Sequence, residues 1–111
     1  MGLRPERIEK ARQILEVVAR THGNPICYSD LTNKVGVAPR AAGGLLGPIC
    51  EQSKKEKGVM LGVLAVSKKS GMPSEPFFDL ARRLDLMKPN ELPQLFFRGQ
   101  LKRVYDVYTK E

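Results

Sequence analysis

The sequence contains no tryptophan, a single histidine and only two cysteines, and this scarcity excludes several kinds of functional site. Cys27 and Cys50 form neither a CxxC motif nor a Cys/His arrangement with the spacing of a zinc site. Each lies beside an isoleucine, so we expect two buried free thiols. His22 lies in a stretch typical of a helix stop and a turn, where we expect a solvated loop residue. The sequence therefore predicts no metal and no cofactor.

Long apolar runs and catalytic motifs are absent as well. No stretch approaches the roughly 20 apolar residues that span a bilayer, and the first residues form no apolar segment. There is no GxSxG motif, phosphate-binding loop, HExxH motif or paired-acid motif. We expect a cytoplasmic protein that is neither an enzyme nor membrane-bound.

Positive charge is what the sequence has in excess. Lysine and arginine number 19 against 12 acidic residues, which gives a net charge of +7 for 111 residues. Clustered cations displace counterions from phosphates, so this balance favours a nucleic-acid partner. The alternative is that the lysines only keep the surface solvated. With 41% apolar residues, the length predicts a single domain over residues 1–111 with one modest core.

Helical periodicity and turn residues define the first half of the chain. Apolar residues at helical spacing predict a helix over Pro5–Arg20, followed by a short extended segment over 25–28. A short helix then begins with Ser29 or Asp30 as its cap and ends at Gly36. A third helix runs from Pro39 to Lys57, kinked or restarted at Pro48.

Glycines are unusually frequent in the first turns of that third helix. Gly43, Gly44 and Gly47 each cost about 0.5–1 kcal/mol relative to alanine. Two explanations stay open: another helix packs closely against this face, or the face enters a groove too narrow for side chains.

The second half of the chain predicts a small hairpin and two helices. Val59–Val66 has the branched apolar composition of a buried strand, and Ser67–Gly71 forms a turn with an exposed cationic tip. The return arm over 72–74 completes a hairpin, the candidate wing over about 59–74. Two C-terminal helices follow over about 75–109. The expected fold class is mainly α with a small β-hairpin, a winged helix-turn-helix (helix pair about 29–57) followed by two helices.

Two short motifs resemble a known DNA-binding domain. Tyr28-Ser-Asp-Leu31 with Gly36, followed by Arg40-Ala-Ala-Gly43-Gly44, resembles the C-terminal DNA-binding domain of the O6-alkylguanine-DNA alkyltransferases and alkyltransferase-like proteins. The resemblance covers about residues 26–71. Compared with the family pattern, two residues are missing before Arg40, and Thr32 replaces the preferred alanine.

The resemblance implies a mode of DNA binding without the family's chemistry. It implies that the third helix lies in the minor groove, that Arg40 inserts into the base stack and that Tyr28 lies near the phosphate of a flipped nucleotide. The family's reactive cysteine occurs in Pro-Cys-His-Arg, which this sequence lacks; the corresponding stretch, 61–66, is purely apolar. We therefore do not expect alkyl transfer.

The sequence as a whole predicts a protein that binds duplex DNA in the minor groove without altering it. One alternative is a protein-interaction module that uses the C-terminal helices, because the pairs Phe77-Phe78 and Phe96-Phe97 are not expected to face one core together. RNA binding ranks third. For Arg40 and Tyr28 the alternatives are a solvated arginine and an ordinary tyrosine at the edge of the core. The predicted DNA-binding residues are Tyr28, Ser29, Lys34, Pro39, Arg40, Ala41, Gly43, Gly44, Lys54, Lys55, Lys68 and Lys69.

Overall fold

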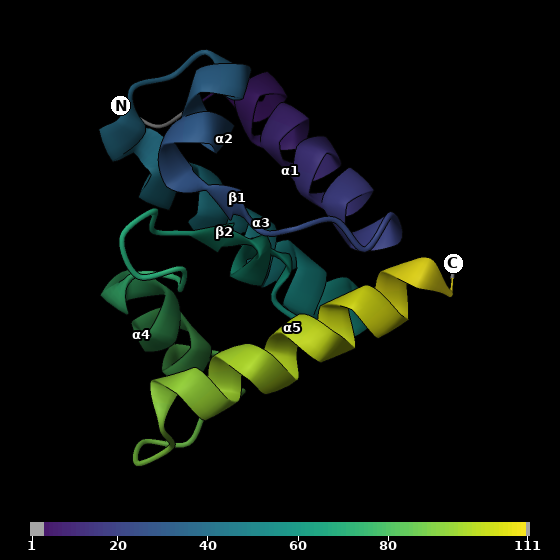
Figure 1. Ribbon diagram of the computed structural model, residues 1–111, viewed down its shortest axis with the longest axis vertical. Helices are drawn as coiled ribbons and strands as arrows, with labels where there is room; N and C mark the ends of the chain where they lie inside the picture. Colours follow the sequence, from purple (N-terminus) through teal and green to yellow (C-terminus); the bar gives the residue numbers. More distant parts are fainter. Residues whose placement is uncertain (1–3, 111) are drawn as a thin grey trace.

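The computed structural model of the chain describes residues 4–110. Within this range the chain forms five α-helices, two short 3-10 helices and two strands of two residues each (Figure 1). The fold is therefore mainly helical, as the sequence predicts. In chain order the elements are α1 (Pro5–Arg20), β1 (Ile26–Cys27), α2 (Tyr28–Val35), η1 (Pro39–Ala41), α3 (Ala42–Lys57), η2 (Leu61–Leu64), β2 (Ala65–Val66), α4 (Glu75–Arg83) and α5 (Pro93–Thr109).

The first two helices begin and end where their proline and glycine residues predict, except at the start of α2. α1 has Pro5 in its first turn, where a missing N–H costs nothing. Gly36 ends α2 with a φ of 86°, a left-handed conformation that glycine adopts without strain. The expected cap at Ser29 or Asp30 is wrong: α2 begins at Tyr28, its N-cap residue is Cys27, and no side chain caps its first turn.

The third helix has a more complicated start than the sequence predicts. Pro39 opens the 3-10 turn η1, and α3 follows it directly. α3 continues through Pro48 to Lys57, and Gly58 closes it with a φ of 72°. Its buried face consists of Leu45, Ile49, Cys50 and Ser53.

The segment between α3 and α4 is the main correction to the expected fold. Val59–Val66 is fully buried, as predicted, but only Ala65 and Val66 form a strand. These two residues pair in parallel with Ile26 and Cys27 of β1. The expected hairpin over 59–74, and with it the wing, is therefore wrong.

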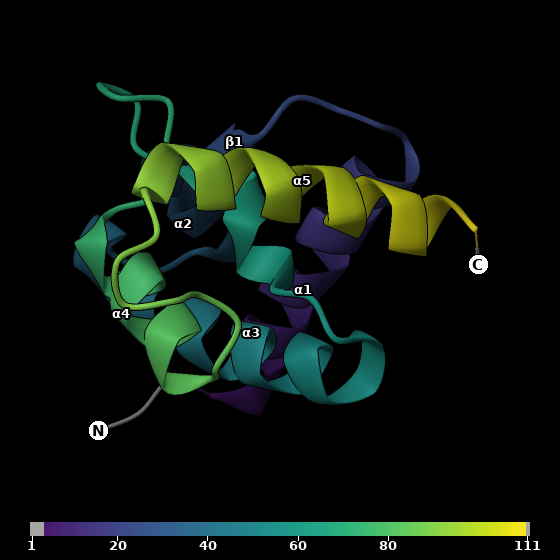
Figure 2. The same cartoon turned by 90° about the horizontal axis from the view of Figure 1, so that it is seen from below.

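The reason lies in how the buried segment satisfies its backbone. η2 packs against α1, α3 and α5, and Figure 2 shows α5 on the opposite side of η2 from α3. The Met60 N–H donates to Oε1 of Gln100 at 2.7 Å, and the Leu61 N–H donates to Oγ of Ser53 at 2.9 Å. Because two buried side chains supply these acceptors, the segment needs no neighbouring strand over most of its length.

The loop that follows β2 is closed by its own backbone. The Ser67 N–H donates to the Met72 carbonyl and the Gly71 N–H donates to the Ser67 carbonyl, both at 2.8 Å. Lys68 and Lys69 are exposed on this loop, which projects from the body of the molecule in Figure 2. A tight loop, not a pair of strands, thus presents the predicted cationic tip.

An aromatic cluster joins α4 to α5. The Phe78 ring lies 5.2 Å from that of Phe77 and 6.5 Å from that of Phe96, measured between centroids. All three are buried, and Phe97 is half-buried against the same core. The expectation that these pairs cannot share one core is therefore wrong.

Among residues 4–110, no helix has both the length and the apolar composition needed to cross a bilayer.

Candidate nucleic-acid interface and the adjoining groove

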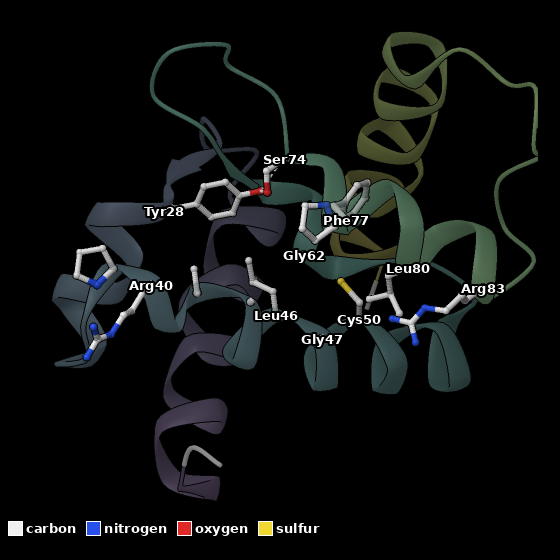
Figure 3. A pocket seen from close by; sticks show the side chains of 14 residues that line it. Tyr28, Arg40, Leu46, Gly47, Cys50, Gly62, Ser74, Phe77, Leu80 and Arg83 are labelled. Atoms are coloured by element: carbon white, nitrogen blue, oxygen red, sulfur yellow. Dashed lines mark hydrogen bonds between the residues drawn. The ribbon is translucent and has the colours of Figure 1, made fainter. Parts of the chain in front are cut away.

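A hollow of about 470 Å³ lies between the first half of α3 and α4; we call it the α3 groove (Figure 3). One end is formed by η1 and the start of α2, and the other by the end of α4. The lining residues are Tyr28, Pro39, Arg40, Ala42, Gly43, Leu46, Gly47, Cys50, Gly62, Ser74, Pro76, Phe77, Leu80 and Arg83.

Glycines on α3 keep the groove open. A Cβ atom at Gly43 or Gly47 would meet no atom within 4 Å outside the local helix backbone. Close packing of another helix against these two positions, one of the two explanations offered by the sequence, is therefore wrong. The other explanation, a face free of side chains that enters a narrow groove, stays a prediction.

Two of the residues that line the α3 groove, Gly62 and Cys50, pack closely against each other. A Cβ atom at Gly62 would lie 2.4 Å from Sγ of Cys50, so only glycine fits there. Burial raises the pKa of the Cys50 thiol to about 12 and keeps it neutral at ordinary pH. Cys50 is therefore a buried free thiol without nucleophilic character, as expected, whereas Cys27 is only half-buried.

Tyr28 connects the start of α2 to the start of α4. Its hydroxyl oxygen accepts a hydrogen bond from the Ser74 N–H at 2.8 Å and lies 3.3 Å from Oγ of Ser74. The ring is half-buried against the core. Tyr28 thus positions the segment that follows the Ser67–Met72 loop.

Two arginines border the α3 groove at opposite ends. Arg40 and Arg83 are both exposed, and neither forms a hydrogen bond or ion pair with another residue in the range 4–110. Neighbouring Arg82 differs, because its guanidinium pairs with Asp79 at 3.3 Å. In Figure 3 the side chain of Arg83 extends back beside Leu80, whereas that of Arg40 points away from the centre of the groove.

The structure brings four of the twelve predicted DNA-binding residues together. Tyr28, Pro39, Arg40 and Gly43 line the α3 groove together. Exposed Gly44 and half-buried Ala41 adjoin them, and Ser29 is exposed in the first turn of α2. Lys34 is exposed in the last turn of α2, and Lys68 and Lys69 lie on the loop before Ser74.

Lys54 and Lys55 lie apart from Arg40 and Gly43. They lie in the last turn of α3, and a rise of 1.5 Å per residue puts them about 18 Å along the helix from Ala42. Their neighbour Lys57 lies over the ring of Tyr108, 5.3 Å from its centroid, so this end of α3 is beside α5.

Sequence reasoning missed the contribution of α4 to the site. The helical spacing over 75–83 indicates that Phe77 and Leu80 are buried and that Arg83 faces water, but nothing in this pattern places α4 beside α3. That contact joins distant segments of the chain, and a helical period reports only which face of a helix is buried.

His22 is an exposed loop residue, as predicted, with a packing role at the turn after α1. Its ring stacks on that of Tyr105 at a centroid distance of 4.9 Å, and its φ is 53°. The Tyr105 hydroxyl donates a hydrogen bond to the Gly23 carbonyl, and burial raises the pKa of that hydroxyl. These contacts fix the turn against α5.

Comparison of the chain with protein-family models, with curated proteins and with solved structures finds no match in any of the three. The resemblance to the alkyltransferase DNA-binding domain therefore depends on the two sequence motifs alone, and function has to be argued from the geometry of this chain.

Proposed function

We propose that the protein binds duplex DNA non-covalently, with η1 and the first turn of α3 in the minor groove. The observation that carries this proposal is the surface formed by Arg40, Gly43 and Gly44. All three residues are exposed, the arginine is unpaired among residues 4–110, and no atom outside the local helix lies within 4 Å of a Cβ position at Gly43.

The dimensions of the minor groove favour such a surface. The groove is about 6 Å wide, so a complete helix with ordinary side chains does not fit. A helix edge without side chains approaches more closely, and arginine is the cation most often inserted where the groove is narrow. Arg40 lies in η1, three residues before Gly43 on the bare edge of α3, and the resemblance implies that an arginine at this position enters the base stack.

Three exposed lysines on the neighbouring segments are candidate phosphate contacts. Lys34 lies at the end of α2, and Lys68 and Lys69 lie on the loop that Tyr28 helps to fix through Ser74. The Tyr28 hydroxyl accepts from Ser74, which leaves its own proton available for a phosphate oxygen. Lys54 and Lys55, at the far end of α3, contribute less in this arrangement.

A fluorescence titration with labelled duplex DNA at two salt concentrations tests the proposal. Arg40→Ala should weaken binding, whereas Arg98→Ala, which removes an exposed arginine from α5, should leave affinity nearly unchanged. Equal losses in both variants would mean that only overall charge matters. Wild-type protein that prefers single-stranded RNA to duplex DNA would favour the RNA alternative.

If the protein binds a partner protein, the contact surface cannot consist of Phe77, Phe78 and Phe96, because these side chains are buried. Leu92 and Leu95, at the start of α5, are 63% and 59% exposed and are the large apolar side chains on the C-terminal helices that solvent reaches most. If they bind a partner protein, Leu92→Ser with Leu95→Ser should abolish that binding and leave DNA affinity unchanged.

A further inference from the structure

The α3 groove has the size and lining of a small-molecule site, a property that DNA binding does not require. Its volume of about 470 Å³ lies within the range of roughly 300–1,000 Å³ typical of ligand pockets. Apolar side chains from two helices, Leu46 on α3 and Phe77 and Leu80 on α4, form its walls. Because Gly43 and Gly47 leave the α3 side bare, the space stays open in the folded chain.

Of the two arginines that line this apolar space, Arg83 is the one placed to bind a charged group of a ligand, because the side chain of Arg40 points away from the centre of the groove. The guanidinium of Arg83 extends beside Leu80 in Figure 3 and has no ion-pair partner among residues 4–110. No aspartate or glutamate lines the groove. A ligand with an apolar body and one negative charge matches this combination, because a guanidinium binds a carboxylate through two parallel hydrogen bonds.

Four of the lining residues offer no free backbone N–H, and this favours a carboxylate over a phosphate. The Ser74 N–H donates to Tyr28 and the Phe77 N–H donates to the Ser74 carbonyl. Pro39 and Pro76 have no N–H at all. Phosphate sites commonly use several free backbone N–H groups.

A partner protein fits the groove less well than a small molecule does. Stable protein interfaces use about 20–30 residues on each side, whereas 14 residues line this groove. The large apolar side chains that are exposed in the structure, Val17, Leu92 and Leu95, all lie outside the lining.

We propose that the α3 groove binds a small hydrophobic carboxylic acid, with its chain between α3 and α4 and its carboxylate on Arg83. The mouth of the groove includes Arg40, so a bound acid adjoins the surface proposed for DNA. The carboxylate site itself does not depend on DNA binding, and its test uses Arg83 and Gly47, which are not among the predicted DNA contacts.

Isothermal titration calorimetry with dodecanoate, below its micelle concentration, tests the site directly. Wild-type protein should bind one dodecanoate per chain with a dissociation constant below about 100 μM. Dodecyltrimethylammonium, which has the same chain and the opposite charge, should not bind. Absence of saturable binding up to about 1 mM dodecanoate, or equal binding of both amphiphiles, would overturn the proposal.

Two pairs of variants locate the binding. Gly47→Leu should abolish it by filling the groove, whereas Gly99→Leu, at an equally open glycine of α5, should leave it unchanged. Arg83→Gln should weaken dodecanoate binding about tenfold, and Arg98→Gln should have no effect. Thermal unfolding verifies that each variant is folded. Unchanged binding by folded Gly47→Leu, or equal losses in the two arginine variants, would place the ligand elsewhere and contradict the proposal.

Discussion

Gln100 on α5 accepts a hydrogen bond from the backbone N–H of Met60 at 2.7 Å, although the two residues are 40 positions apart in the chain. The hydroxyl oxygen of Ser53 on α3 accepts a hydrogen bond from the backbone N–H of Leu61 at 2.9 Å. Both side chains are 4% exposed. The buried backbone at the start of η2 is therefore held from two sides by polar groups that belong to different helices.

Removal of the Gln100 acceptor should destabilise the fold. Gln100→Leu has a similar volume but leaves the Met60 N–H buried without a partner, so we expect a loss of about 1–3 kcal/mol in the free energy of unfolding. Urea unfolding followed by circular dichroism measures it. Gln94→Leu, at an exposed position of the same helix, is the control and should change stability by less than about 0.5 kcal/mol. Similar losses in the two variants would contradict the role of this hydrogen bond.

Gly62 should tolerate no side chain while Cys50 is present. A Cβ atom there would lie 2.4 Å from Sγ of Cys50, so Gly62→Ala should destabilise the protein by about 1–3 kcal/mol through overpacking. In a Cys50→Ala background the sulfur is gone, and the same substitution should cost clearly less. A double-mutant cycle measures this coupling, and additive effects would show that the clash is relieved elsewhere.

Two substitutions at Gly43 should separate the stability of the fold from its affinity for DNA. The position is helical and open, so alanine should stabilise α3 by about 0.5–1 kcal/mol. Under the proposed function, the bulkier Gly43→Leu should weaken duplex binding because its side chain lies on the face that enters the groove of the DNA. Thermal melts and DNA titrations on both variants check this, and full affinity in folded Gly43→Leu would count against minor-groove binding.

Cys50 should be unreactive at pH 8 and should make the fold more sensitive to alkali. Burial raises its pKa to about 12, so its contribution to stability is complete below the thiol's ordinary pKa and is lost as pH rises toward 12. In Cys50→Ala this part of the alkaline loss of stability should disappear.

A thiol reagent at pH 8 should modify half-buried Cys27 faster than Cys50 in the native protein. Equal rates for both cysteines would contradict the assigned burial.

The lysine pairs should differ in their effect on the salt dependence of DNA binding. Lys68→Ala with Lys69→Ala should lower the slope of log affinity against log salt by about 0.9 for each phosphate that the protein no longer neutralises. Lys54→Ala with Lys55→Ala removes the same charge at the far end of α3 and should change the slope less. If the second pair has the larger effect, the proposed orientation on DNA is wrong.

The helices were largely predictable because their signals are local. An apolar stripe and proline at the start defined α1, and Gly36 defined the end of α2. The stretch 59–66 was predicted as buried and is, but its conformation depends on Gln100 and Ser53, which are distant in the chain. A branched apolar run alone does not distinguish a strand from a buried 3-10 segment.

The candidate site was predictable where its residues are neighbours in the chain. Tyr28, Pro39, Arg40 and Gly43, four of the residues that the sequence predicts as DNA contacts, line one hollow. Arg83 completes the opposite end because α4 lies beside α3, and no local pattern reports that contact. The DNA contacts themselves stay predictions.

The parallel pairing of Ile26 with Ala65 and of Cys27 with Val66 has a consequence for the order of folding. Parallel strands cannot be joined by a tight turn, so α2, α3 and η2 all lie within the crossover that connects them. The ladder therefore forms only after this crossover has closed, because the chain entropy lost on closure precedes any gain from the pairing. Slow amide exchange in β1 and β2 would thus report completed folding of the central part of the chain.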